Sequence, residues 1–188
     1  MAAQPLPPLS FLCECFDYKS DTGEFFWKRR PTHHFPDQEH ADSWNTRHAG
    51  RQTFTWRDEE GYGRCEVMYD GRRYRLRSGR VALLMGYGIE AETVDHVNHR
   101  TADDRLVNLR PASQQENIWH RKSQGPRSRR LRGAFPSGHR WHAKITHDGE
   151  TLRLGSFETE IEAHRAYEAA AKRLRGDFHP AFDVSSVS

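Results

Sequence analysis

The sequence predicts an α+β fold in two small domains, on three observations. Short stretches of alternating apolar and polar residues, joined by Gly-containing turns, are typical of antiparallel strands. A capped amphipathic helix follows the last of these stretches. Residues 121–132 separate the N-terminal strand-like stretches from the C-terminal ones, and they carry six basic residues and no acidic one. This stretch also contains Gly125-Pro126, so it indicates a linker, because like charges repel and proline breaks helices. The expected organisation is a domain over 1–122, a basic linker over 123–130, a second domain over 131–180 and a tail over 181–188.

The beginning of the first domain is expected to contain one short helix and one short strand. Residues 10–16 suit the helix, and the turn signal at 21–23 precedes a strand over 24–27. Residues 31–50 contain two prolines and many polar side chains, so they are expected to form an exposed loop.

A β-hairpin and a buried helix are expected next. Apolar and polar residues alternate over 64–77 around the Asp70-Gly71 turn, which is a strong hairpin signal. The apolar run over 81–85 predicts a short buried helix, and Gly86 is expected to end it as a C-cap.

Two further strands are expected around a polar excursion. Residues 94–97 and 106–110 suit the strands, and Pro111 is expected to stop the second one. Within the excursion, Asp103 and Asp104 are expected to cap or brace the loop, and a direct role in the chemistry is the less favoured alternative.

A helix after the second of these strands would complete a group of chemically active residues. Ser113-x-x-Glu116 is a capping-box pattern, which places Asn117 in the first turns and Ile118 on the core side. Strand, loop, strand and helix would then bring Asp95, His96 and Asn117 together. Mg²⁺ takes carboxylate and amide oxygens, and an imidazole can deprotonate an attacking water. This set suits metal-assisted phosphodiester hydrolysis.

The pattern Asp95-His96…Asn108…Asn117 resembles the HNH endonucleases of the ββα-metal fold, in particular the phage and intron-encoded homing branch. The likeness extends over about residues 10–122. It implies that Asp95 and Asn117 bind Mg²⁺ or Mn²⁺ and that His96 is the general base. It also implies that Asn108 holds the loop and positions His96.

The chain departs from the HNH pattern at one position. The family usually has a His-Arg pair at the start of the helix before the motif, whereas this chain has Gly79-Arg80. Arg80 remains a candidate catalytic residue that clamps a substrate phosphate.

The C-terminal part carries a second resemblance. Residues 140–146 alternate, Asp148-Gly149 is a turn signal, and residues 151–156 form a second strand. A helix with a Thr159-x-x-Glu162 capping box follows and is expected to end at Gly176. A three-stranded antiparallel sheet packed on this helix is expected. The elements Arg-Gly at 132–133, Trp-x-Ala-x-Ile at 141–145, Leu-Gly-x-Phe at 154–157 and Ala-x-x-Ala-Tyr-x-x-Ala-Ala at 163–171 resemble the Apetala-type (ethylene-response-factor) DNA-binding domain, which also occurs at the C-terminus of phage HNH endonucleases.

The Apetala-type resemblance implies that the outer sheet face enters the major groove of duplex DNA. Linker arginines would add phosphate contacts, which give affinity without sequence information. The face residues are Arg132, Arg140, Lys144, Thr146, Arg153 and Ser156, and the linker residues are Arg127, Arg129 and Arg130. Plant members often have Trp where Arg153 stands and Glu where Lys144 stands, so their sequence preference does not transfer.

Composition alone leaves the partner open. The 188 residues include 24 Arg among 29 basic residues, and the net charge is only +3. Arginine matches phosphate oxygens well, but GC-rich coding would give the same excess. The clustering of nine basic residues against two acidic ones over 121–155 favours nucleic acid over the coding explanation.

Composition also excludes several classes. No apolar run approaches the roughly 18 residues of a membrane span, and the N-terminus lacks the features of a signal peptide. Three cysteines suit a reducing cytoplasm, that of a bacterial host if the chain is phage-encoded. The Cys and His residues lack the paired spacing of a structural zinc site.

The favoured function is therefore a metal-dependent DNA endonuclease, a monomer without a small-molecule cofactor, that nicks or breaks duplex DNA held by the second domain. The alternative is a non-catalytic DNA-binding regulator with a degenerate HNH scaffold. Loss of the upstream His favours the alternative, and retention of Asp95, His96 and both Asn residues favours the nuclease.

Overall fold

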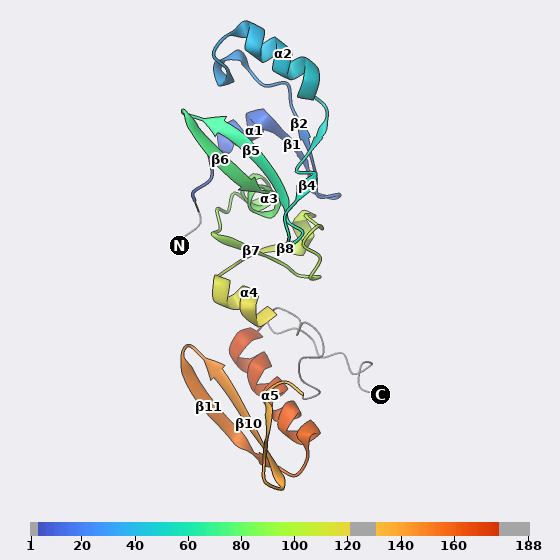
Figure 1. The fold of residues 1–188 in the computed structure, drawn as a ribbon, viewed down its shortest axis with the longest axis vertical. Coiled ribbons are helices and arrows are strands. Elements are labelled where there is room, and N and C mark those ends of the chain that lie inside the picture. Colours follow the sequence, from blue (N-terminus) through green and yellow to red (C-terminus); the bar gives the residue numbers. More distant parts are fainter. Residues whose placement is uncertain (1–3, 121–130, 177–188) are drawn as a thin grey trace. The chain divides into compact units, whose positions relative to one another are not determined.

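The computed structural model describes residues 4–120 and 131–176. Contacts divide the chain into two units, Met1–Gln114 and Gln115–Ser188, and each unit is described by itself. The expected linker over 123–130 and the tail over 181–188 lie outside the described residues. Both units combine helices with small antiparallel sheets (Figure 1). Among the residues described, no helix is long and apolar enough to cross a bilayer.

The first unit has three small sheets, in the orders β1-β2-β3, β4-β5-β6 and β7-β8. Its elements are α1 (Leu9–Cys15), β1 (Phe16–Lys19), β2 (Glu24–Trp27), the 3-10 helix η1 (Thr32–His34), α2 (Gln38–His48), β3 (Gln52–Thr53), β4 (Trp56–Arg57), β5 (Gly63–Tyr69), β6 (Arg72–Arg77), α3 (Ser78–Tyr87), β7 (Thr93–His96), η2 (Leu106–Asn108) and β8 (Leu109–Ala112).

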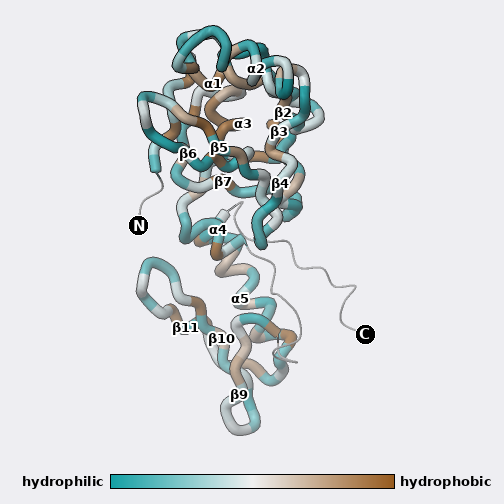
Figure 2. Tube along the Cα trace, turned by 45° about the horizontal axis from the view of Figure 1, so that its top comes forward, coloured by the Kyte–Doolittle hydropathy of each residue, from teal (hydrophilic) through white to brown (hydrophobic). Residues whose placement is uncertain are grey.

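Helix α3 is the centre of the first unit. It contacts α1, β5, β6, β7, β8 and η2, and Val81, Ala82 and Leu83 are fully buried. Figure 2 shows the apolar segments gathered around α3 and β5. Fully burying one Val or Leu side chain stabilises a fold by roughly 1.5–3 kcal/mol. Strand β7 and the 3-10 helix η2, which carry Asp95, His96 and Asn108, therefore pack on one core helix.

The β5–β6 hairpin is confirmed in the expected register. Tyr69 pairs with Arg72 across the two-residue turn. Asp70 and Gly71 both have positive φ, 49° and 70°. Positive φ at both central turn residues suits a type I′ turn, whose twist matches that of the strands.

Helix α3 ends later than the sequence predicts. The C-cap is Gly88, in the left-handed conformation with φ 68°, and Gly86 lies inside the helix. A Cβ at Gly86 would lie 2.6 Å from both Cδ atoms of Leu106. The glycine is therefore explained by the close approach of η2, not by capping.

Residues 31–50 are not the exposed loop that their composition predicts. They contain η1 and the helix α2, whose N-cap Asp37 accepts a hydrogen bond from His40 N. The helix lacks an apolar stripe and is held by a polar anchor. The buried Asn45 accepts from the backbone N–H of Arg30 at 2.8 Å and donates to its carbonyl at 2.9 Å.

The strand expected over 106–110 is displaced toward the C-terminus. Residues 106–108 form η2, and β8 continues through Pro111, which does not stop it. Proline lacks a backbone donor, but β8 pairs with one neighbour, β7, so the missing N–H is tolerated at the open edge.

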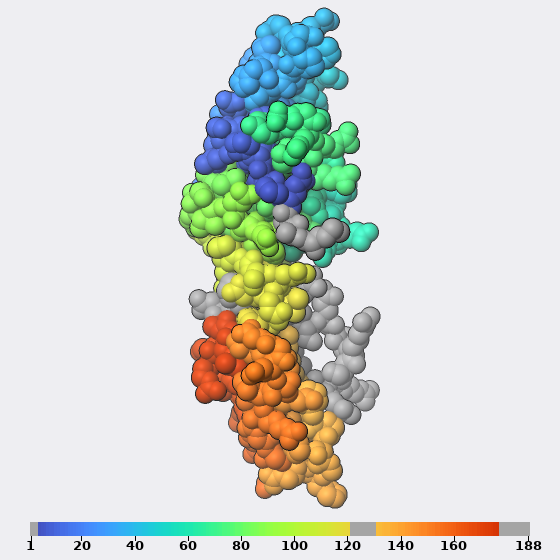
Figure 3. Space-filling view, turned by 90° about the vertical axis from the view of Figure 1, so that its left-hand side faces the viewer, coloured from blue at the N-terminus to red at the C-terminus, as the bar shows by residue number. Residues whose placement is uncertain are grey.

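The second unit contains a three-stranded antiparallel sheet covered on one face by α5. Its elements are α4 (Gln114–His120, which begins at the unit boundary), β9 (Ala134–Ser137), β10 (Arg140–His147), β11 (Glu150–Phe157) and α5 (Glu160–Arg175). The strand order is β11-β10-β9. In Figure 3 the red side chains of α5 lie directly against the orange strands. Ile145, Tyr167 and Ala170 belong to the buried cluster between them.

The caps of α5 are those the sequence predicts. Thr159 and Glu162 form a complete capping box, and Gly176 is the C-cap. Because both ends are satisfied, the helix can present its apolar face to the sheet along its whole length.

Helix α4 groups with the second unit, whereas the sequence places it in the first domain. The Trp119 ring lies 4.9 Å from the His147 ring, and the Arg175 guanidinium lies 5.4 Å from the Trp119 ring. The expectation that Ile118 faces the core is wrong, because Ile118 is 49% exposed. Trp119, not Ile118, is the side chain of α4 that packs against the second unit.

Gly133 provides a test of packing in the second unit. It has φ +77°, and a Cβ there would lie 2.1 Å from the Tyr167 ring. We expect Gly133→Ala to lower the free energy of unfolding by about 3 kcal/mol, from backbone strain and overpacking together. Gly149→Ala is the matched control, because Gly149 has φ +82° and no atom within 4 Å of the added Cβ. It should cost about 1 kcal/mol. Equal shifts in thermal unfolding would contradict the packing of Gly133 on Tyr167.

Candidate active site

Asp95 and His96 are the last two residues of β7, and both are buried, at 6% and 4% exposure. Side chains alternate along a strand, so the two contact different neighbours. Asp95 pairs across the hairpin with Arg110, and His96 contacts Asp104 of the following loop. The strand end thus presents a carboxylate and an imidazole side by side in the chain.

The His96 ring is held at one nitrogen and not at the other. Its Nε2 lies 3.1 Å from Oδ1 of Asp104. In the part of the chain that is described, no hydrogen-bond partner reaches its buried Nδ1. Buried polar atoms in folded proteins nearly always have partners. An orphaned imidazole nitrogen therefore points to a missing water or ligand.

Gly79, where the chain departs from the HNH pattern, lies next to His96. A Cβ at Gly79 would lie 3.5 Å from Cε1 of His96 and 3.4 Å from Oδ1 of Asp104. The Tyr62 ring centre lies 5.7 Å from that of His96. Any side chain at position 79 would begin in contact with the His96–Asp104 pair.

Asp95 can offer oxygen to a hard cation. Its Oδ2 accepts a hydrogen bond from Nε of Arg110 at 2.7 Å. The guanidinium shows that a cationic group is accommodated beside this carboxylate. Carboxylate oxygen is the donor that Mg²⁺ and Mn²⁺ prefer, so Asp95 fits the group that the sequence implies.

Asn108 spans the polar excursion between β7 and η2. Its Oδ1 accepts from the backbone N–H of Asn98 at 2.9 Å, and its Nδ2 donates to the carbonyl of Asp103 at 2.7 Å. Within the loop, Arg105 hydrogen bonds hold the pKa of Asp103 well below its usual range. Asn108 therefore closes the loop that carries Asp104.

Asn117, the second expected metal ligand, lies on α4 and groups with the second unit. The units are not placed relative to each other, so its role as a ligand stays a prediction.

Arg80 is engaged by the fold. Its Nε donates to the carbonyl of Ala91 at 2.7 Å, and its Nη1 donates to the carbonyl of Gln4 at 2.9 Å. Its Nη2 lies 3.7 Å from Glu90, and only 11% of the side chain is exposed. These contacts favour a scaffold role over the phosphate contact expected from the sequence.

The outer face of the second unit's sheet brings the expected DNA-binding residues together. Lys144 pairs directly with Arg153, and Thr146 pairs with Thr151. Arg140 donates to the side-chain and backbone oxygens of Ser156 at 3.0 and 2.9 Å. All of the expected residues here are exposed, namely Arg132, Arg140, Lys144, Thr146, Arg153 and Ser156. Arg127, Arg129 and Arg130 lie outside the described residues.

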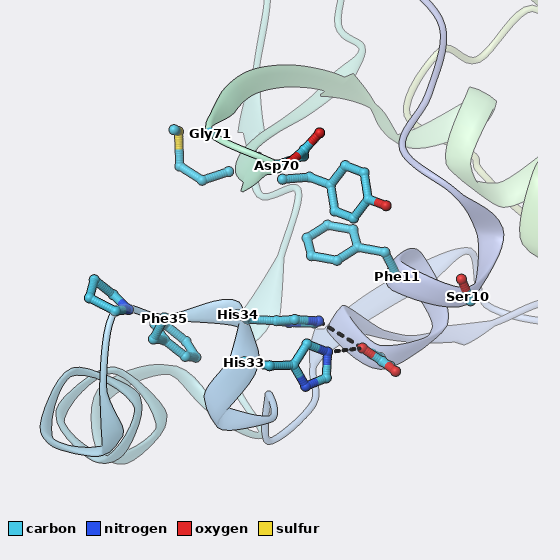
Figure 4. Close-up of a pocket in the computed structure, with 11 residues that line it drawn as sticks. Ser10, Phe11, His33, His34, Phe35, Asp70 and Gly71 are labelled. Carbon is cyan, nitrogen blue, oxygen red and sulfur yellow. Dashed lines mark hydrogen bonds and ion pairs between the residues drawn. The ribbon is translucent and has the colours of Figure 1, made fainter.

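The fold also assembles a cluster that sequence reasoning missed. Oε2 of Glu14 lies 2.7 Å from Nε2 of His34 and 3.3 Å from Nε2 of His33, at the edge of a cavity (Figure 4). These three residues could supply metal ligands. The adjacent His33-His34 pair was the only available signal, and Glu14 lies 19 residues earlier.

The protonation of His34 argues against a metal at this cluster. Nε of Arg30 donates to Nδ1 of His34 at 3.1 Å, so the ring proton sits on Nε2 and is donated to Glu14. Burial lowers the pKa of His34, which favours this neutral form. A metal-bound histidine needs an acceptor at its other nitrogen, and Arg30 is a donor. The cluster is therefore a hydrogen-bonded chain that ties η1 to α1.

Asn108 can be tested through the loop that it closes. Asn108→Ala would leave a backbone donor and a backbone acceptor without partners, so we expect a loss of about 1–3 kcal/mol of stability. The amide of Asn98 should also exchange with solvent faster. Asn98→Ala is the control, because it removes the exposed side-chain contacts to Asp103 and to the Arg100 N–H but keeps the Asn98 backbone N–H and its acceptor on Asn108. Unchanged exchange at position 98 in Asn108→Ala would contradict the bridging role.

No protein-family model matches the chain, and no curated protein matches it. Among solved structures, the chain is similar to one described as DNA binding and cleavage by the HNH homing endonuclease I-HmuI, at 18% sequence identity and a TM-score of 0.37. The similarity covers 55% of this chain and 49% of that chain, so the matched region spans about half of that protein. The candidate site therefore rests on its own geometry.

Proposed function

We propose that the protein is a metal-dependent DNA endonuclease of the HNH type. The observation that carries the proposal is the orphaned Nδ1 of His96 at the strand end that also bears Asp95. An unprotonated imidazole nitrogen is the group that takes a proton from an attacking water. The buried carboxylate of the preceding residue, Asp95, supplies the hard oxygen donor of a phosphodiesterase centre.

In the proposed reaction, each residue of the first unit has one task. His96 accepts the proton of the attacking water at Nδ1. Asp95 would hold Mg²⁺ or Mn²⁺, with Asn117 as the proposed second ligand. When bound, such an ion stabilises the charge that develops on the phosphate and on the leaving oxygen. Asn108 keeps the loop closed next to His96.

The second unit is proposed to hold duplex DNA. Its outer sheet face carries exposed Arg140, Lys144 and Arg153, while α5 covers the other face. Arginine on a guanine edge gives roughly 1–3 kcal/mol of discrimination. The three linker arginines would add phosphate contacts. One centre per chain suits nicking by a monomer.

The catalytic proposal is tested with supercoiled plasmid and Mg²⁺ or Mn²⁺. We expect wild type to nick or linearise the plasmid and His96→Ala to be slower by about 10²–10⁴-fold, the usual contribution of a general base. His33→Ala is the matched control, because His33 lies on η1 and is largely exposed. It should cleave at the wild-type rate.

Two outcomes would reject parts of the proposal. If wild type binds the plasmid and leaves it intact, the protein is the non-catalytic DNA-binding regulator instead. If His96→Ala cleaves as fast as wild type, His96 is not the base.

The DNA-binding proposal is tested by the salt dependence of binding. Each lysine–phosphate contact adds about 0.9 to the slope of log K against log salt. We expect Lys144→Ala to weaken binding and to lower the slope by about one. Lys172→Ala is the matched control, because Lys172 is exposed on α5. Equal effects of the two substitutions on binding of a duplex would show that the sheet face is not the binding surface.

A further inference from the structure

Asp104 lies in the loop between β7 and η2 with only 2% exposure, and both of its carboxylate oxygens have partners. Oδ1 lies 3.1 Å from Nε2 of His96. Oδ2 accepts a hydrogen bond from Oγ of Ser78 at 2.5 Å. Nη1 of Arg57 lies 3.8 Å from Oδ2. A carboxylate is seldom buried without such partners, because leaving water is costly for a charge.

The backbone of Asp104 is held as closely as its side chain. The hydroxyl of Tyr18 donates to the Asp104 carbonyl at 2.7 Å, and burial raises the pKa of Tyr18, so the hydroxyl stays a donor. A Cβ at Gly23 would lie 2.6 Å from the carbonyl carbon of Asp104. The turn between β1 and β2 thus packs directly against this residue and fixes where its carboxylate lies.

The neighbouring Asp103 braces the loop, because its carboxylate makes contacts within the loop itself. Its carboxylate binds Arg105 and Asn98, which belong to the same loop. The carboxylate of Asp104 instead contacts β7, α3 and β4. The expectation that both acids brace the loop therefore holds for Asp103 alone.

We propose that Asp104 is the positioning residue of His96. The inference rests on the proposed nuclease function. A carboxylate only accepts hydrogen bonds, so the ring proton of neutral His96 sits on Nε2 and the lone pair on Nδ1. Nδ1 is also the atom for which the described residues provide no partner. Asp104 thereby fixes both the tautomer and the orientation that leave Nδ1 able to accept a proton.

Gly79 lies directly beside the His96–Asp104 pair. Position 79 lies in the first turn of α3, and even a Cβ would touch both His96 and Asp104. A larger side chain with its own donor would compete for Oδ1 of Asp104. With glycine at this position, Asp104 is the hydrogen-bond partner of Nε2 of His96 among the described residues.

The ring tautomer of His96 is a direct test and does not depend on activity. We expect ¹⁵N NMR of ring-labelled wild type, at a pH where His96 is neutral, to show the proton on Nε2. Asp104→Leu removes the acceptor and should give a mixture of tautomers, whereas Asp103→Leu should leave the His96 signals as in wild type. A proton on Nδ1 in wild type would overturn the proposal without any variant.

Cleavage kinetics supply the second measurement. Measured over a range of plasmid concentrations, Asp104→Leu should lower kcat about 10–100-fold and leave KM within about twofold, the loss typical when a hydrogen-bond partner behind a metal-site histidine is removed. Asp104→Asn offers an amide oxygen as acceptor and should recover most of kcat, provided that both variants show cooperative thermal unfolding. A wild type that cleaves while Asp104→Leu keeps its kcat would overturn the positioning role alone. A wild type that does not cleave would reject the nuclease function and the positioning role with it.

Discussion

The candidate site of the first unit depends on the hydrogen bonds made by the buried carboxylate of Asp104. It joins the end of β7, the start of α3 and β4, and its backbone joins β1. In a low-dielectric interior such hydrogen bonds are strong, and a missing one is costly. Moving any one of these segments would therefore take a partner away from a buried charge.

Much of the fold could be predicted because local chemistry decided it. The turn at Asp70-Gly71 and the capping box of α5 each rest on neighbouring residues, and both occur where expected. The helix α2 was missed because it has no apolar stripe, and Asn45 anchors it to the backbone of Arg30, 15 residues away. Gly86 was misread as a cap because its reason, the approach of Leu106, is also distant in sequence.

The candidate site, too, could be predicted from the sequence only in part. Asp95 and His96 could be singled out because an acid beside a histidine is visible in the sequence. The tie between His96 and Asp104 crosses only eight residues, but sequence spacing does not say which of two adjacent acids turns inward. That choice depends on Tyr18 and Ser78, which belong to other segments. The hydrogen bonds that engage Arg80 likewise come from residues outside its helix.

The bulge between β10 and β11 places two like charges directly opposite each other. Register shifts between Ala143 and Lys144, so Lys144 faces Arg153 across the strands. Facing cations destabilise a sheet, and the Phe135 ring, 4.4 Å from Nζ of Lys144, offsets part of this repulsion. Without a bound anion, the repulsion between these two side chains therefore opposes the strand pairing around them. A polyanion lying across the pair would relieve the same repulsion.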